Sequence, residues 1–271
     1  MNKAKRDILP VWQPIGVSTN RLSQIVGEQF NTLSSHTGTL DPMAEGVVII
    51  LLGDARFKKY EYACWPKTYV FEIVFGLATD SYDGMGFIKA KSTKYPLEKE
   101  CKDVCAKYVG PYSQKVPIYS AVKVKGRKLF EWGHSGEKPG KIPVKKGEIY
   151  SLELLNYRKI RAKTVIDNIL SRLRKIKGNF RQEPIILQWE KVKDTLGATD
   201  WTAARFEVEM TKGLYVRSLS QDICKKLKCK GFVYSLKRTK NGNYRKRDCM
   251  DVAELFGSWK NFYNLISGVK P

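Results

Sequence analysis

One loop of the sequence places a single carboxylate among residues that make tight turns. The segment from His36 to Pro42 reads HTGTLDP, with Asp41 directly before the proline. The apolar run that follows, Val47 to Leu52, is expected to form a buried strand that holds the loop in place. A carboxylate held in this way can act as a nucleophile or as a general base. Asp-Pro is also a common turn dipeptide, so the residues alone leave an ordinary turn open.

The chain is strongly basic. Its 271 residues include 49 lysines and arginines but only 27 aspartates and glutamates, which gives a formal net charge of +22. With 42% hydrophobic and 28% charged residues, the composition is that of a folded protein. A folded protein with this excess of positive charge most often binds a polyanion, usually nucleic acid. A cationic surface that serves solubility is the alternative.

Several classes of protein are disfavoured by what the sequence lacks. No apolar stretch approaches the roughly 20 residues that cross a bilayer, and no apolar signal-peptide core follows the charged N-terminus. The six cysteines form no C-x-x-C pair, and the two histidines, His36 and His134, lie far from any cysteine pair. We therefore expect reduced, mostly buried cysteines, no metal site, no membrane association and a cytoplasmic location.

The elements that must position the loop are mostly strands. Apolar and β-branched runs predict strands at residues 47–52, 68–76, 118–124, 147–157, 205–212 and 231–239. Apolar spacing predicts helices at 18–30, 97–108 and 214–228, with shorter ones near 55–64 and 127–136. Residues 34–46 are interpreted as a loop and 79–86 as a turn. This irregular order predicts an α+β fold with a mixed, largely antiparallel central sheet flanked by helices and loops.

Residues 158–200 differ from their surroundings. They hold a strongly basic helix candidate at 160–177, with apolar residues on one face, and a second segment around 182–193. Because strands are expected on both sides, we interpret this stretch as a basic helical insertion between two strands.

The sequence HTGTLDPMAEGVVIILLGDARF at residues 36–57 resembles the catalytic motif of the TruB-type tRNA pseudouridine-55 synthases, which isomerise a uridine in the T arm of tRNA. Further blocks resemble the other motifs of that family in the same order along the chain. They are PIGVS at 14–18, KTY at 67–69 with FGLATDSYD at 75–83, QKVPIYSAVK at 114–123 and KGLYVRSL at 212–219. The resemblance implies the pseudouridine synthase fold.

The resemblance also implies roles for the residues of a pocket. Asp41 would be the catalytic aspartate, Tyr69 would stack on the flipped uracil, and Arg217 would pair with Asp41 and keep its carboxylate ionised. The same pocket would be completed by Leu214, Tyr215 and His36, the last of which would help to wedge the target base out of its loop. The reaction only breaks a C–N glycosidic bond and forms a C–C bond, so no cofactor is implied.

Basic side chains are expected to bind the phosphates of the RNA. Residues 117–143 resemble the family's mobile thumb, which closes on the T arm. The candidates for RNA binding are Lys67, Asp83, Lys123, Arg127, Lys128 and Lys212. For Asp83 a role in the turn is an equal alternative, and for Lys123 a structural role is. Other basic clusters lie in the insertion and in the stretch 237–247, which includes Arg238.

Three features depart from the family pattern. Bacterial members usually carry a C-terminal PUA domain, whereas here we expect a catalytic domain over residues 1–249 and a short helical tail over 250–271, without a full PUA domain. The insertion at 158–200 lies outside the bacterial pattern, and our hypothesis is that it replaces part of the missing RNA-binding area. Glu45 stands where the family more often has a small residue or threonine, and nothing in the sequence explains it.

Together these observations predict a stand-alone, monomeric enzyme that isomerises uridine 55 in the T arm of tRNA, with no obligate protein partner. One alternative is the guide-RNA-dependent branch of the superfamily, which the thumb-like block at 117–143 and the short C-terminus disfavour. The other is a catalytically silent RNA-binding or tRNA-folding protein on the same scaffold. The presence of Asp41, Tyr69 and Arg217 together disfavours that second alternative.

Overall fold

The computed structural model describes residues 7–267, and the chain divides into two compact units. The first unit is built from the residues up to Tyr69, from Arg172–Asn179 and from the residues after Ser235. The second comprises Val70–Ser171 and Phe180–Ser235. The units interleave along the sequence, whereas the predicted catalytic domain over 1–249 is continuous, and that domain boundary stays a prediction.

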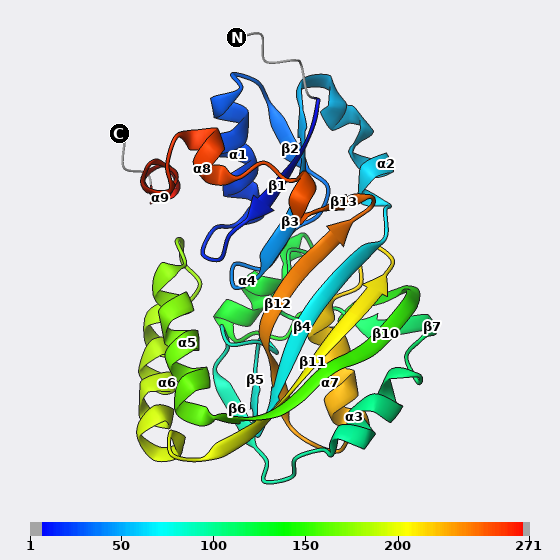
Figure 1. Cartoon of the computed structure of the whole chain (residues 1–271), viewed down its shortest axis with the longest axis vertical. Coiled ribbons are helices and arrows are strands. Elements are labelled where there is room, and N and C mark those ends of the chain that lie inside the picture. The colour runs from blue at the N-terminus through cyan, green and yellow to red at the C-terminus, as the bar shows by residue number, and fades with distance from the viewer. Residues whose placement is uncertain (1–6, 268–271) are drawn as a thin grey trace. The chain divides into compact units, whose positions relative to one another are not determined.

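A buried strand, β3 (Glu45–Leu52), organises the first unit (Figure 1). Strands β1 (Ile8–Gln13) and β2 (Ser34–His36) pair with it in antiparallel fashion, and the end of β12 pairs with it in parallel. Alternate side chains of β3 pack into a hydrophobic cluster that the partly buried rings of Trp12 and Trp65 border. Apolar residues fill both faces of β3, as expected for a strand that is covered on both sides.

Helix α1 (Thr19–Gln29) begins where the sequence predicts it. The backbone N–H of Arg21 donates to Oγ of Ser18 at 3.2 Å, which makes Ser18 the N-cap, and the apolar face with Leu22 and Ile25 is buried. The other elements of this unit are η1 (Gly53–Lys58), α2 (Lys59–Ala63), the start of β4 (Lys67–Phe75), the end of β12 (Gly231–Asn241), β13 (Tyr244–Arg245), η2 (Lys246–Asp248), α8 (Val252–Phe256) and α9 (Trp259–Ser267).

The sheet of the second unit has the order β12-β4-β11-β10-β7. Its long hairpin is formed by β10 (Val144–Arg161) and β11 (Asp200–Met210), and β7 (Gly110–Lys115) pairs with β10. The helices α3 (Glu98–Cys105) and α7 (Val216–Lys226) pack on these strands. The smaller elements are β5 (Leu77–Thr79), β6 (Ile88–Lys91), β8 (Lys123–Val124), β9 (Arg127–Lys128) and α4 (Leu129–Ser135). The predicted α+β fold with a largely antiparallel sheet is confirmed.

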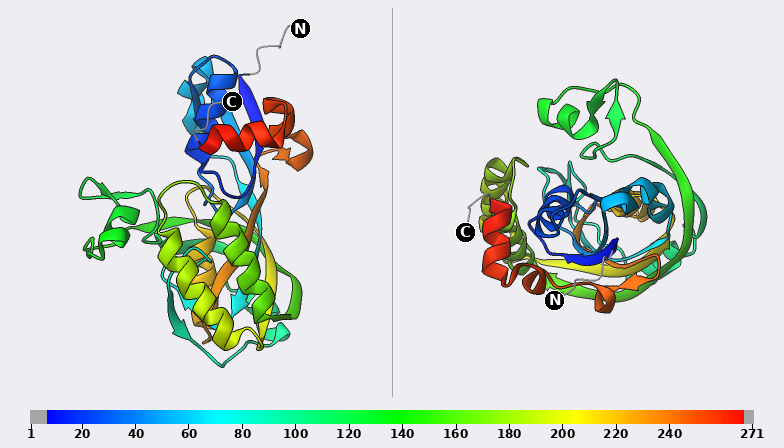
Figure 2. Two further views of the ribbon diagram at one scale, coloured as in Figure 1. Left: turned by 90° about the vertical axis from the view of Figure 1, so that its left-hand side faces the viewer. Right: turned by 90° about the horizontal axis from the view of Figure 1, so that it is seen from above.

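The insertion folds into two helices, α5 (Ala162–Lys175) and α6 (Gln182–Leu196), which lie side by side (Figures 1 and 2). Strands β10 and β11 stay paired as far as Arg161 and Asp200, whose side chains form an ion pair at 3.3 Å. The inserted segment is therefore residues 162–199, a little shorter than the predicted 158–200.

Two local predictions are wrong. The predicted loop 34–46 begins with strand β2, because residues 34–36 find ladder partners on the edge of β3. The strand predicted at 118–124 exists only as the two residues of β8. In its place the chain bends, with the N–H of Ser120 donating to the carbonyl of Ile118, and the carbonyl of Tyr119 accepts a hydrogen bond from a distant arginine. Composition carries no sign of that tertiary hydrogen bond.

Candidate active site

Asp41 lies in the loop between β2 and β3, and hydrogen bonds hold its two neighbours. The N–H of Leu40 donates to the hydroxyl of Thr19 at 2.8 Å, so helix α1 anchors one side of the loop. On the other side, the carbonyl of Pro42 accepts from the N–H of Gly16 at 2.8 Å. The loop is thus tied to the predicted PIGVS motif, and the half-buried Asp41 sits on a fixed backbone.

Arg238 on β12 supports the same loop from beneath. Its side chain is buried, and its Nε and Nη2 donate to the carbonyls of Val47 at 2.6 Å and Gly38 at 3.1 Å. Gly46 permits this arrangement, because a Cβ there would collide with the backbone of Arg238, and its φ of +140° suits glycine. The expectation that Arg238 belongs to a phosphate-binding surface cluster is therefore wrong: its guanidinium is satisfied inside the protein.

His36 is the last residue of β2 and is buried. Its Nε2 lies 2.6 Å from the side-chain oxygen of Asn20, which fits a neutral imidazole that donates from Nε2. Burial first, and then the positive charges of Lys59 and Arg238, lower the pKa of His36 from 6.5 to about 4. The ring is therefore uncharged at neutral pH.

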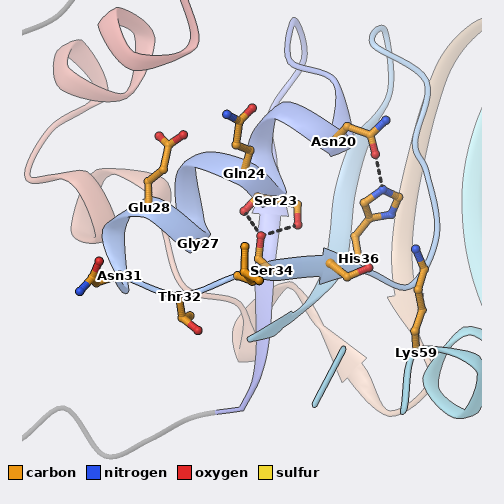
Figure 3. A pocket seen from close by; sticks show the side chains of 12 residues that line it. Asn20, Ser23, Gln24, Gly27, Glu28, Asn31, Thr32, Ser34, His36 and Lys59 are labelled. Atoms are coloured by element: carbon orange, nitrogen blue, oxygen red, sulfur yellow. Dashed lines mark hydrogen bonds between the residues drawn. The ribbon is translucent and has the colours of Figure 1, made fainter. Parts of the chain in front are cut away.

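Beside His36 lies a groove of about 700 Å³, formed by residues of α1, β2 and the chain between them (Figure 3). Asn20 and Gln24 of α1 line it, and Lys59 reaches it from α2. Most of the other side chains that line the groove are small or polar. Such a groove suits a polar ligand, such as a nucleotide, better than an apolar one.

Strand β4 brings two predicted site residues into the first unit. Tyr69 is buried, with 8% of its surface exposed. Lys67 is buried as well, and its ammonium group donates to the carbonyls of Ala63 at 3.0 Å and Trp65 at 2.7 Å. These bonds tie the end of α2 to β4, so Lys67 has a structural role, and its contact with RNA stays a prediction.

In the second unit, Arg217 gathers segments that are far apart in the sequence. It lies in the first turn of α7 and is buried. Its Nη1 donates to the carbonyl of Ser81 at 3.1 Å, and its Nη2 donates to the carbonyl of Tyr119 at 3.0 Å. Its Nε lies 3.7 Å from a carboxylate oxygen of Asp83. The blocks at 75–83, 114–123 and 212–219 thus meet at the guanidinium group of Arg217.

Asp83 is buried by this arrangement. Its Oδ1 accepts from the hydroxyl of Ser81 at 2.5 Å and from the N–H of Met85 at 2.9 Å. Burying a carboxylate costs free energy unless it is paired and hydrogen-bonded, and Asp83 has both an ion-pair partner and hydrogen bonds. Asp83 therefore has the role in the turn that the sequence left as an alternative, and a direct contact with RNA stays a prediction.

Leu214 and Tyr215 lead into α7. Leu214 is buried beside Gly147. The side chain of Gln114 holds the backbone of Tyr215 from both sides, since its Oε1 accepts from the N–H of Tyr215 at 2.5 Å and its Nε2 donates to the carbonyl at 3.2 Å. Gln114 thus fixes the backbone at the start of α7, the helix that carries Arg217. Its place in the QKVPIYSAVK block gave no sign of this role.

The thumb-like segment forms a small lobe of β8, β9 and α4 that projects from the rest of its unit (Figure 2). Lys123 and Lys128 are exposed on it. Arg127 is half-buried, pairs with Glu137 at 2.9 Å and lies over the ring of Trp132. The fourth predicted RNA-binding lysine, Lys212, is half-buried just after β11. All four roles stay predictions.

The predicted site residues divide between the units. Asp41, His36 and Tyr69 belong to the first, whereas Leu214, Tyr215 and Arg217 belong to the second. The pairing of Asp41 with Arg217 stays a prediction. Within residues 7–267 no group of three histidine, cysteine, aspartate or glutamate side chains could hold a metal ion. Nor is any helix in that range long and apolar enough to cross a membrane.

Known proteins share both the sequence and the fold. Residues 32–170 match the model of the TruB family pseudouridylate synthase N-terminal domain. The chain is 31% identical over 235 residues to tRNA pseudouridine synthase B of Caldicellulosiruptor saccharolyticus, covering 87% of this chain and 67% of that protein. It is 32% identical over 251 residues to tRNA pseudouridine synthase B of Aquifex aeolicus, covering 91% of this chain and 72% of that protein.

Among solved structures, a chain from a Cbf5–Nop10–Gar1 complex is similar in fold, with a TM-score of 0.57 and 17% identity. The match covers 95% of this chain but 58% of that one, so this chain spans less than two thirds of that structure. The family model covers half of the chain and carries the Asp41 loop, the Tyr69 strand and the Asp83 turn. The chain therefore belongs to the TruB family of pseudouridylate synthases.

Proposed function

We propose that this protein converts the uridine at position 55, in the T arm of tRNA, to pseudouridine. Family membership and relatives named tRNA pseudouridine synthase B support the tRNA pseudouridine synthase activity. The observation that carries the proposal is the Asp41 loop, in which a carboxylate is set on a backbone tied to α1 and to Gly16. Its immobility suits a group that must act at one atom of the substrate.

The reaction is an isomerisation, so its atoms balance without a co-reactant. The bond between N1 of the uracil and C1′ of the ribose breaks, and a bond between C5 and C1′ forms. The proton on C5 leaves to water, and N1 gains a proton. Asp41 acts on the ribose, either as a nucleophile at C1′ or as a base at C2′.

The other residues hold the flipped nucleotide and the catalytic group. Tyr69 stacks on the extruded uracil, and Leu214 and Tyr215 line its pocket. Arg217 pairs with Asp41 from its rigid position beside Asp83. His36, which is uncharged in the folded protein, helps to wedge the target base out of its loop.

The net charge of +22 and the exposed lysines of the thumb-like lobe supply phosphate contacts. The enzyme acts in the cytoplasm as a monomer, without a protein partner or a guide RNA. Sedimentation of the protein with and without tRNA checks the monomeric state, and a dimer that persists in the complex would contradict it.

The position is tested on an unmodified tRNA transcript. After incubation with the protein, pseudouridine is mapped by carbodiimide labelling and primer extension. We expect one new stop, at position 55, and none in a matched transcript with cytidine there. A stop at another position in both transcripts would refute the assignment to position 55 while leaving the synthase activity intact.

A further inference from the structure

The inserted helices reach the network around Arg217. Strands β10 and β11 remain paired up to Arg161 and Asp200, so a short turn could connect them. The chain instead builds α5 and α6 there, and α6 packs on the rest of the second unit through Trp189. The indole N–H of Trp189 donates to the carbonyl of Gly84 at 3.2 Å, and the centroid of its ring lies 5.5 Å from that of the Phe232 ring. The insertion is thus fixed beside the turn that carries Asp83.

Arg181, in the link between α5 and α6, points its side chain into this network. Its guanidinium lies 4.1 Å from the ring centroid of Tyr119 and 5.0 Å from that of Phe87. Its Nη1 donates to Oδ2 of Asp80 at 3.1 Å. The side chain of Arg181 is 17% exposed and that of Asp80 is 15% exposed, so this is a largely buried ion pair.

The backbone at Arg181 is bent to make this contact. Its φ of 62° and ψ of 29° are left-handed, a conformation that costs a non-glycine residue about 1 to 2 kcal/mol. Such strain persists only where surrounding contacts over-determine it, as the two aromatic rings and the carboxylate do here.

Asp80 and Tyr119 are themselves linked. The hydroxyl of Tyr119 donates to the same Oδ2 of Asp80 at 2.9 Å. Burial first, and then the nearby Asp80, raise the pKa of Tyr119 to about 12, so its hydroxyl stays protonated and able to donate. Each of Arg181, Asp80 and Tyr119 therefore contacts the other two.

This set holds the two carbonyls that bind Arg217. One belongs to Tyr119 itself, and the other belongs to Ser81, the residue next to Asp80. We propose that Arg181 is a positioning residue supplied by the inserted hairpin, which fixes Asp80 and Tyr119 and, through their backbone, the guanidinium of Arg217. The inference rests on the proposed role of Arg217 in the synthase reaction.

The test separates positioning from RNA binding. Arg181→Ala, Arg181→Lys and wild type are compared by single-turnover tritium release from uridine-labelled tRNA and by filter binding of the same tRNA. We expect Arg181→Ala to lower the single-turnover rate about tenfold to a hundredfold, as small displacements of a catalytic group do, with the dissociation constant changed less than about threefold. Arg181→Lys keeps the charge but loses the planar stacking, so it recovers part of the rate.

Lys193→Ala is the matched control. This lysine is also a cation of the insertion, but it pairs with Asp167 on the same helical hairpin at 2.6 Å and lies half-exposed. We expect it to leave the rate and the dissociation constant unchanged. A loss of tRNA affinity in Arg181→Ala with an unchanged single-turnover rate would make Arg181 an RNA contact and overturn the proposal.

A variant that keeps the arginine guards against misfolding. Tyr119→Phe removes the hydroxyl bond to Asp80 but keeps the ring, and we expect a smaller loss of rate with native circular dichroism. A full rate in this variant together with an unfolded Arg181→Ala would overturn the proposal in favour of a purely structural role. An inactive wild type would overturn the proposed function, whereas an active wild type matched by Arg181→Ala would overturn this inference alone.

Discussion

The buried, neutral His36 predicts how the stability of the protein depends on pH. Its pKa is lowered from 6.5 to about 4 in the folded protein, chiefly by burial. The unfolded chain therefore binds a proton to this ring between about pH 6.5 and pH 4, while the folded protein does not. Folding stability falls as the pH falls through this window, and the difference corresponds to about 3 kcal/mol. Above pH 6.5 the residue contributes nothing to the pH dependence.

The perturbation is His36→Gln, which keeps an N–H donor for Asn20 and cannot be protonated. Urea unfolding of wild type and variant is measured at pH 7, 5.5 and 4.5. We expect wild type to lose about 2 to 3 kcal/mol more stability than the variant between pH 7 and pH 4.5. His134→Gln is the control, since the other histidine is exposed. Equal pH dependence in wild type and His36→Gln would refute the buried neutral imidazole.

Three further predictions concern the scaffold of the site. Arg238→Met leaves the carbonyls of Val47 and Gly38 without their donor, and we expect a loss of about 3 to 6 kcal/mol in urea unfolding; an unchanged midpoint would contradict this. Gly46→Ala should lower the melting temperature by several degrees, because its Cβ meets the backbone of Arg238. Asp83→Asn should lower the single-turnover rate by about tenfold, since it weakens the hold on Arg217; weaker tRNA binding in a filter assay at a full rate would speak against this and favour an RNA contact.

The sequence predicts the elements of this fold well where one pattern decides them. The apolar run of β3 and the apolar spacing and Ser18 cap of α1 depend on local residues, so their positions are confirmed. The strand expected at 118–124 is wrong because the backbone there serves the side chain of Arg217. Periodicity reports which residues are buried but carries no information on which distant group a carbonyl will bind.

The same limit applies to the charged residues of the site. Arg238 and Arg181 both stand among lysines and arginines, and by composition both belong to basic surface clusters. Only the fold shows that each turns inward, one beneath the Asp41 loop and the other onto Asp80 and Tyr119. The motifs indicated Asp41, Tyr69 and Arg217 as site residues, and they also contain Asp83 and Gln114, which hold Arg217 and the start of its helix. Thr19, Arg238 and Arg181, which support the site as well, lie outside the motifs.

We expect Asp41 to catalyse the isomerisation of a tRNA uridine. Tritium at C5 of uridine is released to water when the new C–C bond forms, so release counts the reaction directly. We predict release by wild type and none by Asp41→Asn, with both proteins binding the tRNA equally in a filter assay. Release by Asp41→Asn at the wild-type rate, or binding without release by wild type, would contradict this role of Asp41.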